Sequence, residues 1–458
     1  MNRTFKGILG FVLSLAMVIS FTLPAFGSAP EGAETTDIYS SWAGEDVFLA
    51  QSVYRLGNEG TYSNFKGALS GAKFAAVAES LELVFETDYE YSYGDGPLTR
   101  GQVISALFGL RYGGSPSEDE ALEYFVENGL ILGRKDGGYQ LDEICTVEEM
   151  IIFASRVYDY GVYEADNYST GFFWQAEGKS NTVYLLGSIH LSDNSIYPLN
   201  KSANIAFARS ANLVVEADIS DISVEESDRM LEMAFIDPES GFTIADFISE
   251  ETFDLLAQVC EAMGLPPEYY LYMQPWMAIN LVTLLIMMDG DAEQLESQAQ
   301  MGIDMHYLFW AAETGKNIMQ LESVLFQLEL LSSSSYELQD LMLYETLMSV
   351  VEPSETDENE VADLFNILKQ ALKDGDDVLM ALYLGIEEGD VDPMIAEYHK
   401  NMFYHRDVAM TEKIAGYLEE TEYNGNYFIV VGAGHLVGDQ SIVAQLTEKG
   451  YDVVRVRK

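Results

Sequence analysis

The sequence contains little cysteine and little histidine, and each shortage narrows the classes of protein that fit. Only two cysteines, Cys145 and Cys260, occur in 458 residues, and they stand far apart. This pattern excludes a disulfide scaffold and a cysteine-based zinc motif, so we expect both thiols to be buried like small apolar side chains. The five histidines leave few candidates for imidazole chemistry.

Positive charge is scarce as well. Lys and Arg total 24 against 75 Asp and Glu, which gives a formal net charge of −51. Such a chain repels nucleic acid phosphates and anionic lipid headgroups, so we expect no nucleic acid partner. The same negative charge would attract cationic peptides or divalent ions. The alternative is that the acidic residues only form a solvated surface. Hydrophobic residues make up 48% of the chain, enough for a large core and two or three domains.

Long hydrophobic runs are absent except at the N-terminus. Arg3 and Lys6 precede the apolar stretch 7–23, and small residues follow at 25–27. This order predicts a signal peptide over residues 1–27, and therefore a secreted or cell-surface location in a bacterium. An uncleaved N-terminal anchor is the alternative, because the stretch is nearly long enough to span a bilayer. We expect no further transmembrane helix.

Residues 37–163 repeat one pattern of helix, turn, short extended piece and helix. Thr146 precedes an amphipathic run and has Glu149 three residues later, which is the signature of a capped helix start. A similar start occurs at Thr99. Imperfect repeats of one unit share a core with their neighbours, so we expect a smaller, mainly α-helical module here. The polar stretch 163–170 predicts the domain boundary.

Two histidines follow two predicted strands. The apolar run 183–186 ends in Gly187-Ser188-Ile189-His190, and the run 427–431 ends in Gly432-Ala433-Gly434-His435. Ligands in open α/β sheets bind at the carboxyl ends of strands, where glycine lets backbone and substrate approach closely. His190 and His435 are therefore either functional or hydrogen-bonded structural residues. The occurrence of two such endings favours function.

A carboxylate joins them. The predicted helix 200–210 leads to the strand 213–216, so strand, helix and strand form a βαβ unit that places Glu216 beside His190. A carboxylate in an apolar strand must be paired or ligated, and a salt bridge to Arg209 or Arg406 is the alternative. Residues 170–458 thus predict an α/β domain with a mixed sheet flanked by helices and a long helical middle section.

The same residues resemble a known family. Five motifs in the order of residues 170–458 are similar to the TraB/PrgY/GumN family, which includes the Tiki proteases: GSIHLSDNSIYPL, LVVEAD, QPWMAIN, GIDMHYLFWAAETGKNIMQLES and YFIVVGAGHLVGDQSIVAQLTEKGYDVVRV. Residues 40–160 resemble S-layer homology modules, which implies attachment to a cell-wall polymer. Only Leu98-Thr99-Arg100 keeps the Thr-Arg pair of those modules, so a spacer or lid is the alternative.

The family resemblance implies a metal-dependent peptidase acting on a peptide or protein. His190, Glu216 and His435 would hold a divalent ion, Mn, Co or Zn, whose bound water attacks a carbonyl. Arg406 would polarise that carbonyl or hold a substrate carboxylate, and Asp304 and Glu322 match recurring acidic positions. The family has Arg-Asn where this chain has Arg406-Asp407, so Asp407 departs from the pattern.

Two other functions use the same residues. A histidine could act as a general base on water without a metal, in an esterase-like hydrolase. The cleft could instead capture a peptide or a metal-containing ligand without any reaction. Retention of His190, Glu216 and His435 together favours hydrolysis.

Overall fold

The computed structural model describes residues 39–457 except 41–42, 59, 88–93, 134–137, 165–167, 221, 288–297, 300, 352–359, 387–392 and 423–424. The predicted signal segment 1–27 lies outside the described residues. None of the helices in the described ranges is both long enough and apolar enough to cross a membrane.

The chain divides into two units. Of the described residues, one unit contains Ser169–Ile196 and the residues from Arg209 onward, and the other contains residues 39–168 together with Tyr197–Ala208. The first break falls at the end of the polar stretch 163–170. The second unit therefore also takes most of helix α7 (Lys201–Arg209), which the sequence assigns to the α/β domain.

The N-terminal unit is helical and internally repeated. Three of its helices begin directly after short extended segments that pair with one another. The Leu69 amide donates to the Cys145 carbonyl (2.8 Å), the Cys145 amide to the Leu98 carbonyl (2.8 Å), and the Leu98 amide to the Leu69 carbonyl (3.1 Å). These bonds close a ring, so three stretches of similar sequence occupy equivalent positions. The helices are α2 (Gly44–Phe48), α3 (Gly71–Phe85), α4 (Arg100–Tyr112), α5 (Glu118–Glu127) and α6 (Val147–Glu164), with a π-helical turn at Leu49–Val53.

Side-chain caps start four of these helices, including α6, where Thr146 and Glu149 exchange the predicted capping hydrogen bonds. Ser70 accepts a hydrogen bond from the Lys73 amide at the start of α3, and Thr99 forms a capping box with Gln102 at the start of α4. Cys145 is buried in the core of this unit, and Cys260 is buried in the other unit; both are free thiols, as predicted.

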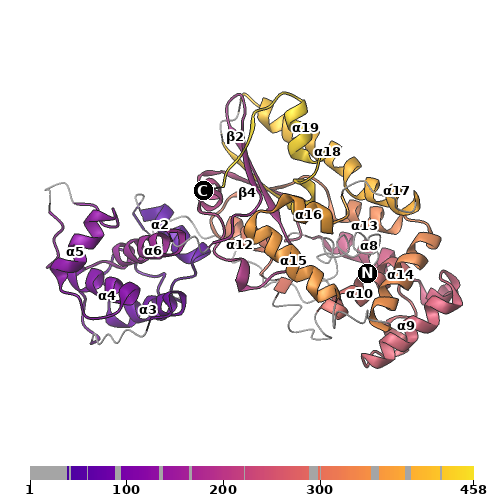
Figure 1. Cartoon of the computed structure of the whole chain (residues 1–458), viewed down its shortest axis with the longest axis horizontal. Coiled ribbons are helices and arrows are strands. Elements are labelled where there is room, and N and C mark those ends of the chain that lie inside the picture. The colour runs from indigo at the N-terminus through magenta and orange to yellow at the C-terminus, as the bar shows by residue number, and fades with distance from the viewer. Residues whose placement is uncertain are drawn as a thin grey trace. The chain divides into compact units, whose positions relative to one another are not determined.

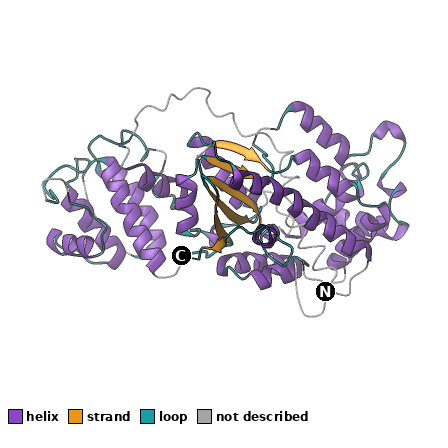
Figure 2. Cartoon of the chain, turned by 90° about the horizontal axis from the view of Figure 1, so that it is seen from above, coloured by secondary structure: helices purple, strands orange, loops and turns teal. Residues whose placement is uncertain are grey.

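A six-stranded mixed sheet organises the C-terminal unit. The strands are β1 (Phe173–Glu177), β2 (Thr182–Ser188), β3 (Asn212–Val215), β4 (Asn317–Gln320), β5 (Tyr427–Gly432) and β6 (Val453–Arg455), in the order β4-β3-β5-β2-β1-β6. The strands β4, β3, β5 and β2 are parallel, while β1 pairs antiparallel with both β2 and β6. The predicted α/β fold class with a mixed sheet is confirmed. Figure 2 shows the strands as one twisted sheet among helices.

Two details of the sheet differ from the prediction. Strand β5 lies between β2 and β3, so Glu216 follows a strand that neighbours the His435 strand and not the His190 strand. Strand β4 lies within the stretch that the sequence predicts as helical, because a four-residue edge strand is too short to show a periodicity of two.

The long middle section forms a second core. Its buried residues come from α8 (Val224–Ala234), α9 (Glu250–Ala262), α10 (Pro275–Met287), α13 (Val324–Ser332), α14 (Tyr336–Val351) and α17 (Pro393–Met402). Figure 1 shows α9, α10, α14 and α17 grouped away from the strands. Helices α12 (Ile303–Glu313) and α18 (Tyr404–Glu419) pack on the sheet, and α19 (Ile442–Glu448) packs on α18 and β6. The remaining helices of this unit are α15 (Glu360–Asp374) and α16 (Asp377–Tyr383).

Candidate active site

Three parallel strands deliver the three predicted residues to one edge of the sheet. Ser188 at the end of β2 is paired with Gly432 at the end of β5, and Val215 at the end of β3 is paired with Val430. His190, Glu216 and His435 come just after these positions, and they are 8%, 6% and 4% exposed. A Cβ at Gly187 would lie 2.9 Å from the Phe172 side chain and one at Gly432 would lie 3.3 Å from Glu216, so these glycines allow close packing at the strand ends.

His190 is held by a carboxylate from another helix. Its Nδ1 lies 2.9 Å from Oδ2 of Asp304, in the first turn of α12, and Ser188 donates to the other Asp304 oxygen at 2.8 Å. Burial alone would lower the pKa of His190, but the charge and hydrogen bond of Asp304, helped by Glu216, raise it overall. Asp304 thus fixes the ring and leaves Nε2 without a hydrogen bond from any described residue.

Gly302 allows Asp304 to reach the His190 imidazole. A Cβ at Gly302 would lie 2.1 Å from the carbonyl oxygen of His190, so no other residue fits. The next amide, of Ile303, donates to the Ile189 carbonyl at 3.2 Å. The start of α12 is therefore docked on the backbone of the His190 segment, and Asp304 arrives in reach of the imidazole.

His435 has a matching partner. Its Nδ1 lies 2.5 Å from Oδ1 of Asp407 in α18, and the Phe403 ring packs beside it with centroids 5.5 Å apart. Burial raises the pKa of Asp407 to about 6, although His435 and Arg406 act in the opposite direction. At the position where the family has asparagine, this chain therefore uses an aspartate as hydrogen-bond acceptor for the histidine.

Glu216 is fully engaged. One carboxylate oxygen accepts from Arg406 and from Gln327 (2.9 Å), and the other accepts from the Gly432 amide (2.9 Å) and lies 3.7 Å from His435 Nε2. Burial alone would raise the pKa of Glu216, but Arg406 and the two histidines lower it well below its usual range. The carboxylate is therefore ionised and fixed in orientation.

Arg406 is occupied by the same network. Its guanidinium pairs with Glu216 and with Glu322 (2.7 Å), donates to the Met402 carbonyl (3.2 Å) and is only 2% exposed. Burial would lower the pKa of Arg406, but the two carboxylates raise it. The geometry gives Arg406 the task of positioning Glu216, because Nε and Nη2 of its guanidinium are directed at Glu216 and Glu322.

Some residues of the site carried no recognisable sequence signal. Gln327 on α13 bonds both Glu216 and Glu322, yet a glutamine in an apolar helix has no motif around it. Ser188 is the second residue of the first Gly-x-x-His segment and could have been noticed there. Glu322 reaches the site because β4 places it beside Glu216, whose carbonyl accepts the Glu322 amide at 2.8 Å.

The donor types suit a divalent ion. In both histidines a carboxylate contacts Nδ1, which is the outer-shell arrangement that orients metal-binding imidazoles. Nε2 is then the ring atom that would bind the ion. Glu216 offers the oxygen that lies 3.7 Å from His435 Nε2. Within the described ranges, however, no group of three or more His, Cys, Asp or Glu side chains is already gathered around one point.

A pocket opens beside His190, and we call it the His190 pocket. Its polar part is formed by Ser188, His190 and the backbone of 432–434, and its other walls are apolar. The apolar residues are Ile189, Leu191, Phe365, Leu368, Met380 and Leu384.

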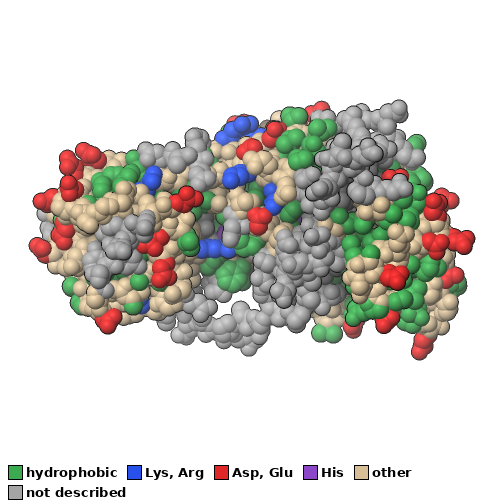
Figure 3. Space-filling view, turned by 60° about the horizontal axis from the view of Figure 1, so that its bottom comes forward, with side chains coloured by type: hydrophobic (Ala, Val, Ile, Leu, Met, Phe, Trp, Pro, Cys, Tyr) green, Lys and Arg blue, Asp and Glu red, His purple; other side chains and the backbone are tan. Residues whose placement is uncertain are grey.

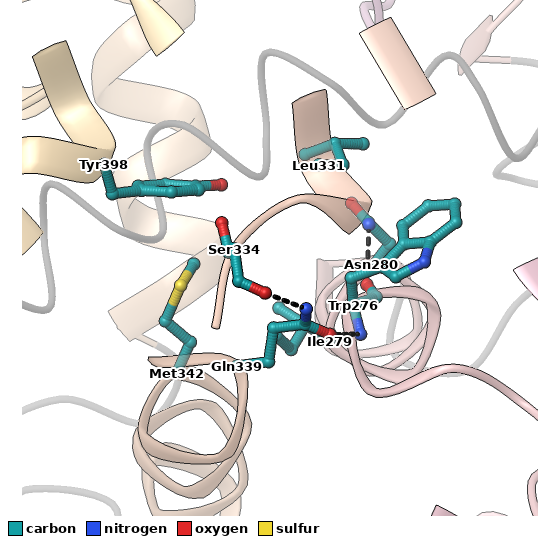
Figure 4. Close-up of a pocket in the computed structure, with 8 residues that line it drawn as sticks. All are labelled: Trp276, Ile279, Asn280, Leu331, Ser334, Gln339, Met342 and Tyr398. Carbon is teal, nitrogen blue, oxygen red and sulfur yellow. Dashed lines mark hydrogen bonds between the residues drawn. The ribbon is translucent and has the colours of Figure 1, made fainter. Parts of the chain in front are cut away.

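A second pocket lies among the helices of the middle section (Figure 4). Trp276, Ile279 and Asn280 of α10 line one side, and Tyr398 of α17 points its hydroxyl toward Ser334. The Asn280 amide donates to the Trp276 carbonyl at 2.8 Å. Tyr398 lies close enough to Arg406 for the guanidinium to act on the pKa of its phenol, which burial raises strongly. This pocket therefore adjoins the charged network from the helical side.

The fold and these pairs define an α/β domain with two histidine–carboxylate pairs at neighbouring strand ends. A model of the TraB/PrgY/gumN family matches residues 172–455, and the chain belongs to this family. The match leaves out the N-terminal unit, for which the S-layer resemblance stays a prediction.

Two curated relatives are similar to the chain. The protein YbaP of Escherichia coli (strain K12) is 22% identical over 265 residues, which is 57% of this chain and 87% of YbaP. YbaP of Shigella flexneri matches with the same values. No solved structure matches the chain significantly.

Proposed function

We propose that the C-terminal unit is a hydrolase that cleaves a carbonyl compound, foremost a peptide bond, at the edge where His190 and His435 meet. The observation that carries the proposal is the pair of buried imidazoles, each with Nδ1 held by a carboxylate. A histidine fixed in this way presents Nε2 as a proton acceptor or as a ligand. A purely structural role for His190 would not require a second histidine–carboxylate pair at the end of the neighbouring strand.

In this proposal His190 transfers protons, and the other site residues position it and the charged groups beside it. His190 borders the pocket and would take a proton from water or return it to the leaving group, while Asp304 keeps its ring in place. His435 and the ionised Glu216 follow the neighbouring strands β5 and β3 at the same edge. Arg406 positions Glu216 and keeps it charged.

A divalent ion is part of the proposal. His190, Glu216 and His435 would hold it, and when bound it supplies an acidified water and a Lewis acid for the carbonyl. The metal-free alternative uses a histidine alone as general base, and it is supported by the engagement of both Glu216 oxygens with protein donors. Capture of a peptide without cleavage is the third outcome to be tested.

The experiment measures metal content and peptide and ester hydrolysis on protein beginning at Ser28. Wild type, His190→Ala and His435→Ala are compared with and without Mn²⁺, Co²⁺ or Zn²⁺. His405→Ala is the matched control, because this histidine is exposed on α18 directly beside Arg406. We expect both site variants to lose activity and the control to keep it.

The results separate the three versions. Stoichiometric metal that is lost in both site variants, together with lost cleavage, supports the metallopeptidase. Cleavage that persists in chelator but needs the histidines supports the general-base mechanism. A folded wild type that cleaves nothing contradicts the hydrolase and leaves capture.

The N-terminal unit has a separate proposed role, retention at the cell wall. The Arg100 guanidinium pairs with the buried Glu149 and donates to the Tyr139 carbonyl at 2.9 Å, so it stabilises the unit itself. Wall binding would therefore need other residues. Co-sedimentation of the full chain with isolated cell walls tests it.

A further inference from the structure

We propose that the His190 pocket selects substrates by an uncharged aliphatic side chain next to the cleaved bond. The inference rests on the proposed hydrolase function and names the substrate class for it. Three observations support the inference: the position of the pocket beside His190, its apolar lining and the packing of the helices that form its walls.

The position of the pocket ties it to the reaction. His190 itself and the backbone of Gly432, Ala433 and Gly434 form one side, so a group inside the pocket lies directly beside the proposed reacting histidine. A substrate whose carbonyl reaches Nε2 would place a neighbouring side chain here.

The lining is almost free of charge. Phe365 and Leu368 of α15 and Met380 and Leu384 at α16 form the opposite wall. Among the described residues, His190 is the one ionisable side chain that lines the pocket. Burying a carboxylate there without a partner would be unfavourable, whereas an aliphatic group gains from leaving water.

The walls are fixed by local structure. Asp376 caps α16 by accepting from the Leu379 amide at 2.9 Å, and α15 packs against α16. A Cβ at Gly434 would lie 2.7 Å from the Phe403 ring and 3.1 Å from Leu384, so this glycine lets the histidine segment and the α16 wall come together. The empty space of about 420 Å³ includes open solvent at the mouth, so it is an upper bound on the group that the pocket admits.

The test uses random peptide mixtures and identifies cleavage products by mass spectrometry. We expect Leu, Ile or Met on one side of the cleaved bond, with Asp and Glu excluded. Since one methylene in an apolar pocket changes kcat/KM by roughly 10- to 200-fold, the preference for Leu over Ala should reach at least about tenfold.

A matched pair of variants examines the wall. Leu368→Ala enlarges the pocket and should shift the preference from Leu toward Phe by about tenfold. Leu364→Ala removes the same atoms one turn earlier on α15, where the leucine is equally buried but does not line the pocket. It should leave the ratio of Phe to Leu cleavage unchanged. Leu384→Phe, which fills the space, provides a second test if Leu368→Ala does not fold.

A binding measurement keeps the inference distinct from the hydrolase proposal. N-acetyl-leucinamide should broaden or shift the His190 imidazole signals in NMR, and N-acetyl-glycinamide at equal concentration should not. Cleavage without side-chain preference, or equal effects of Leu368→Ala and Leu364→Ala, overturns the inference while the hydrolase stands. Selective binding of the leucine amide by a protein that cleaves nothing supports the pocket and overturns the hydrolase.

Discussion

At the scale of single residues, the candidate site is a cluster of buried charges that compensate one another. Arg406 carries one positive charge between Glu216 and Glu322, and all three side chains are at most 8% exposed. A buried ion pair adds little to stability compared with an apolar replacement, but removing one partner strands the others. Retaining this cluster makes sense if its purpose is to hold Glu216 ionised and oriented.

The first prediction follows from that balance. Arg406→Met should lower the free energy of unfolding by about 3–5 kcal/mol, because two buried carboxylates lose their counter-charge. Urea unfolding followed by circular dichroism measures this value. Arg229→Met is the control, because Arg229 forms an exposed pair with Glu232 and its removal should cost no more than about 0.5 kcal/mol. Equal losses in both variants would contradict the role given to Arg406.

A second prediction concerns pH. Burial lowers the pKa of Lys316, which donates to the Ser210 carbonyl at 2.6 Å, to about 8. Between about pH 8 and the ordinary lysine value near 10.4 the unfolded chain binds more protons than the folded one, so this residue makes stability rise with pH.

The measurement compares wild type with Lys316→Met in urea unfolding from pH 7 to 10.5. We expect the stability of wild type relative to this variant to increase over the interval. The exposed Lys400→Met variant should show no such trend relative to wild type. A flat difference for Lys316→Met would refute the assigned burial effect.

At the scale of elements, the site depends on how strand ends and helix starts meet. Strands β2, β3 and β5 supply His190, Glu216 and His435, while α12 and α18 supply the carboxylates that hold the two imidazoles. The close approach at Gly302 brings α12 into register with the His190 segment.

The third prediction tests this approach. Gly302→Ala should reduce hydrolysis by about 100-fold, because its Cβ would overlap the His190 carbonyl and move Asp304 away from the imidazole. Initial rates and thermal unfolding are measured together. Gly416→Ala in α18 is the control: nothing lies near its Cβ, and it should stabilise the helix by up to about 1 kcal/mol. Full activity in Gly302→Ala would contradict the proposed docking.

The sequence predicted the elements with strong local patterns. The apolar runs ending in Gly-x-x-His are strands β2 and β5. The neighbour of β3 could not be predicted, because strand order depends on contacts between residues far apart in the chain. For the same reason the sequence did not predict that Asp304 and Asp407 would each face a histidine.

At the scale of the whole molecule, negative charge dominates. In the view of Figure 3, red acidic side chains are spread over the surface, while blue basic ones are few. A net charge of −51 favours solubility, and it destabilises a compact state through self-repulsion.

The fourth prediction is that salt stabilises this protein. Raising NaCl from about 0.01 M to 1 M shortens the Debye length from about 30 Å to about 3 Å and should raise the Tm by several degrees. Scanning calorimetry measures the shift. Choline chloride should act equally, because screening does not depend on the identity of the cation. An unchanged or lower Tm would show that self-repulsion is not a significant cost.

Strand β5 has a consequence for synthesis. It lies between β2 and β3 in the sheet, yet it is made almost last. While the ribosome still holds residues 427–432, the nascent chain can form the pair β1–β2 and the pair β3–β4, but the strand that pairs with both β2 and β3 is missing. The sheet, and with it the histidine edge, can close only after nearly the whole polypeptide has emerged. A chain stopped shortly before Tyr427 would therefore carry His190 and Glu216 without the strand that lies between theirs and without His435.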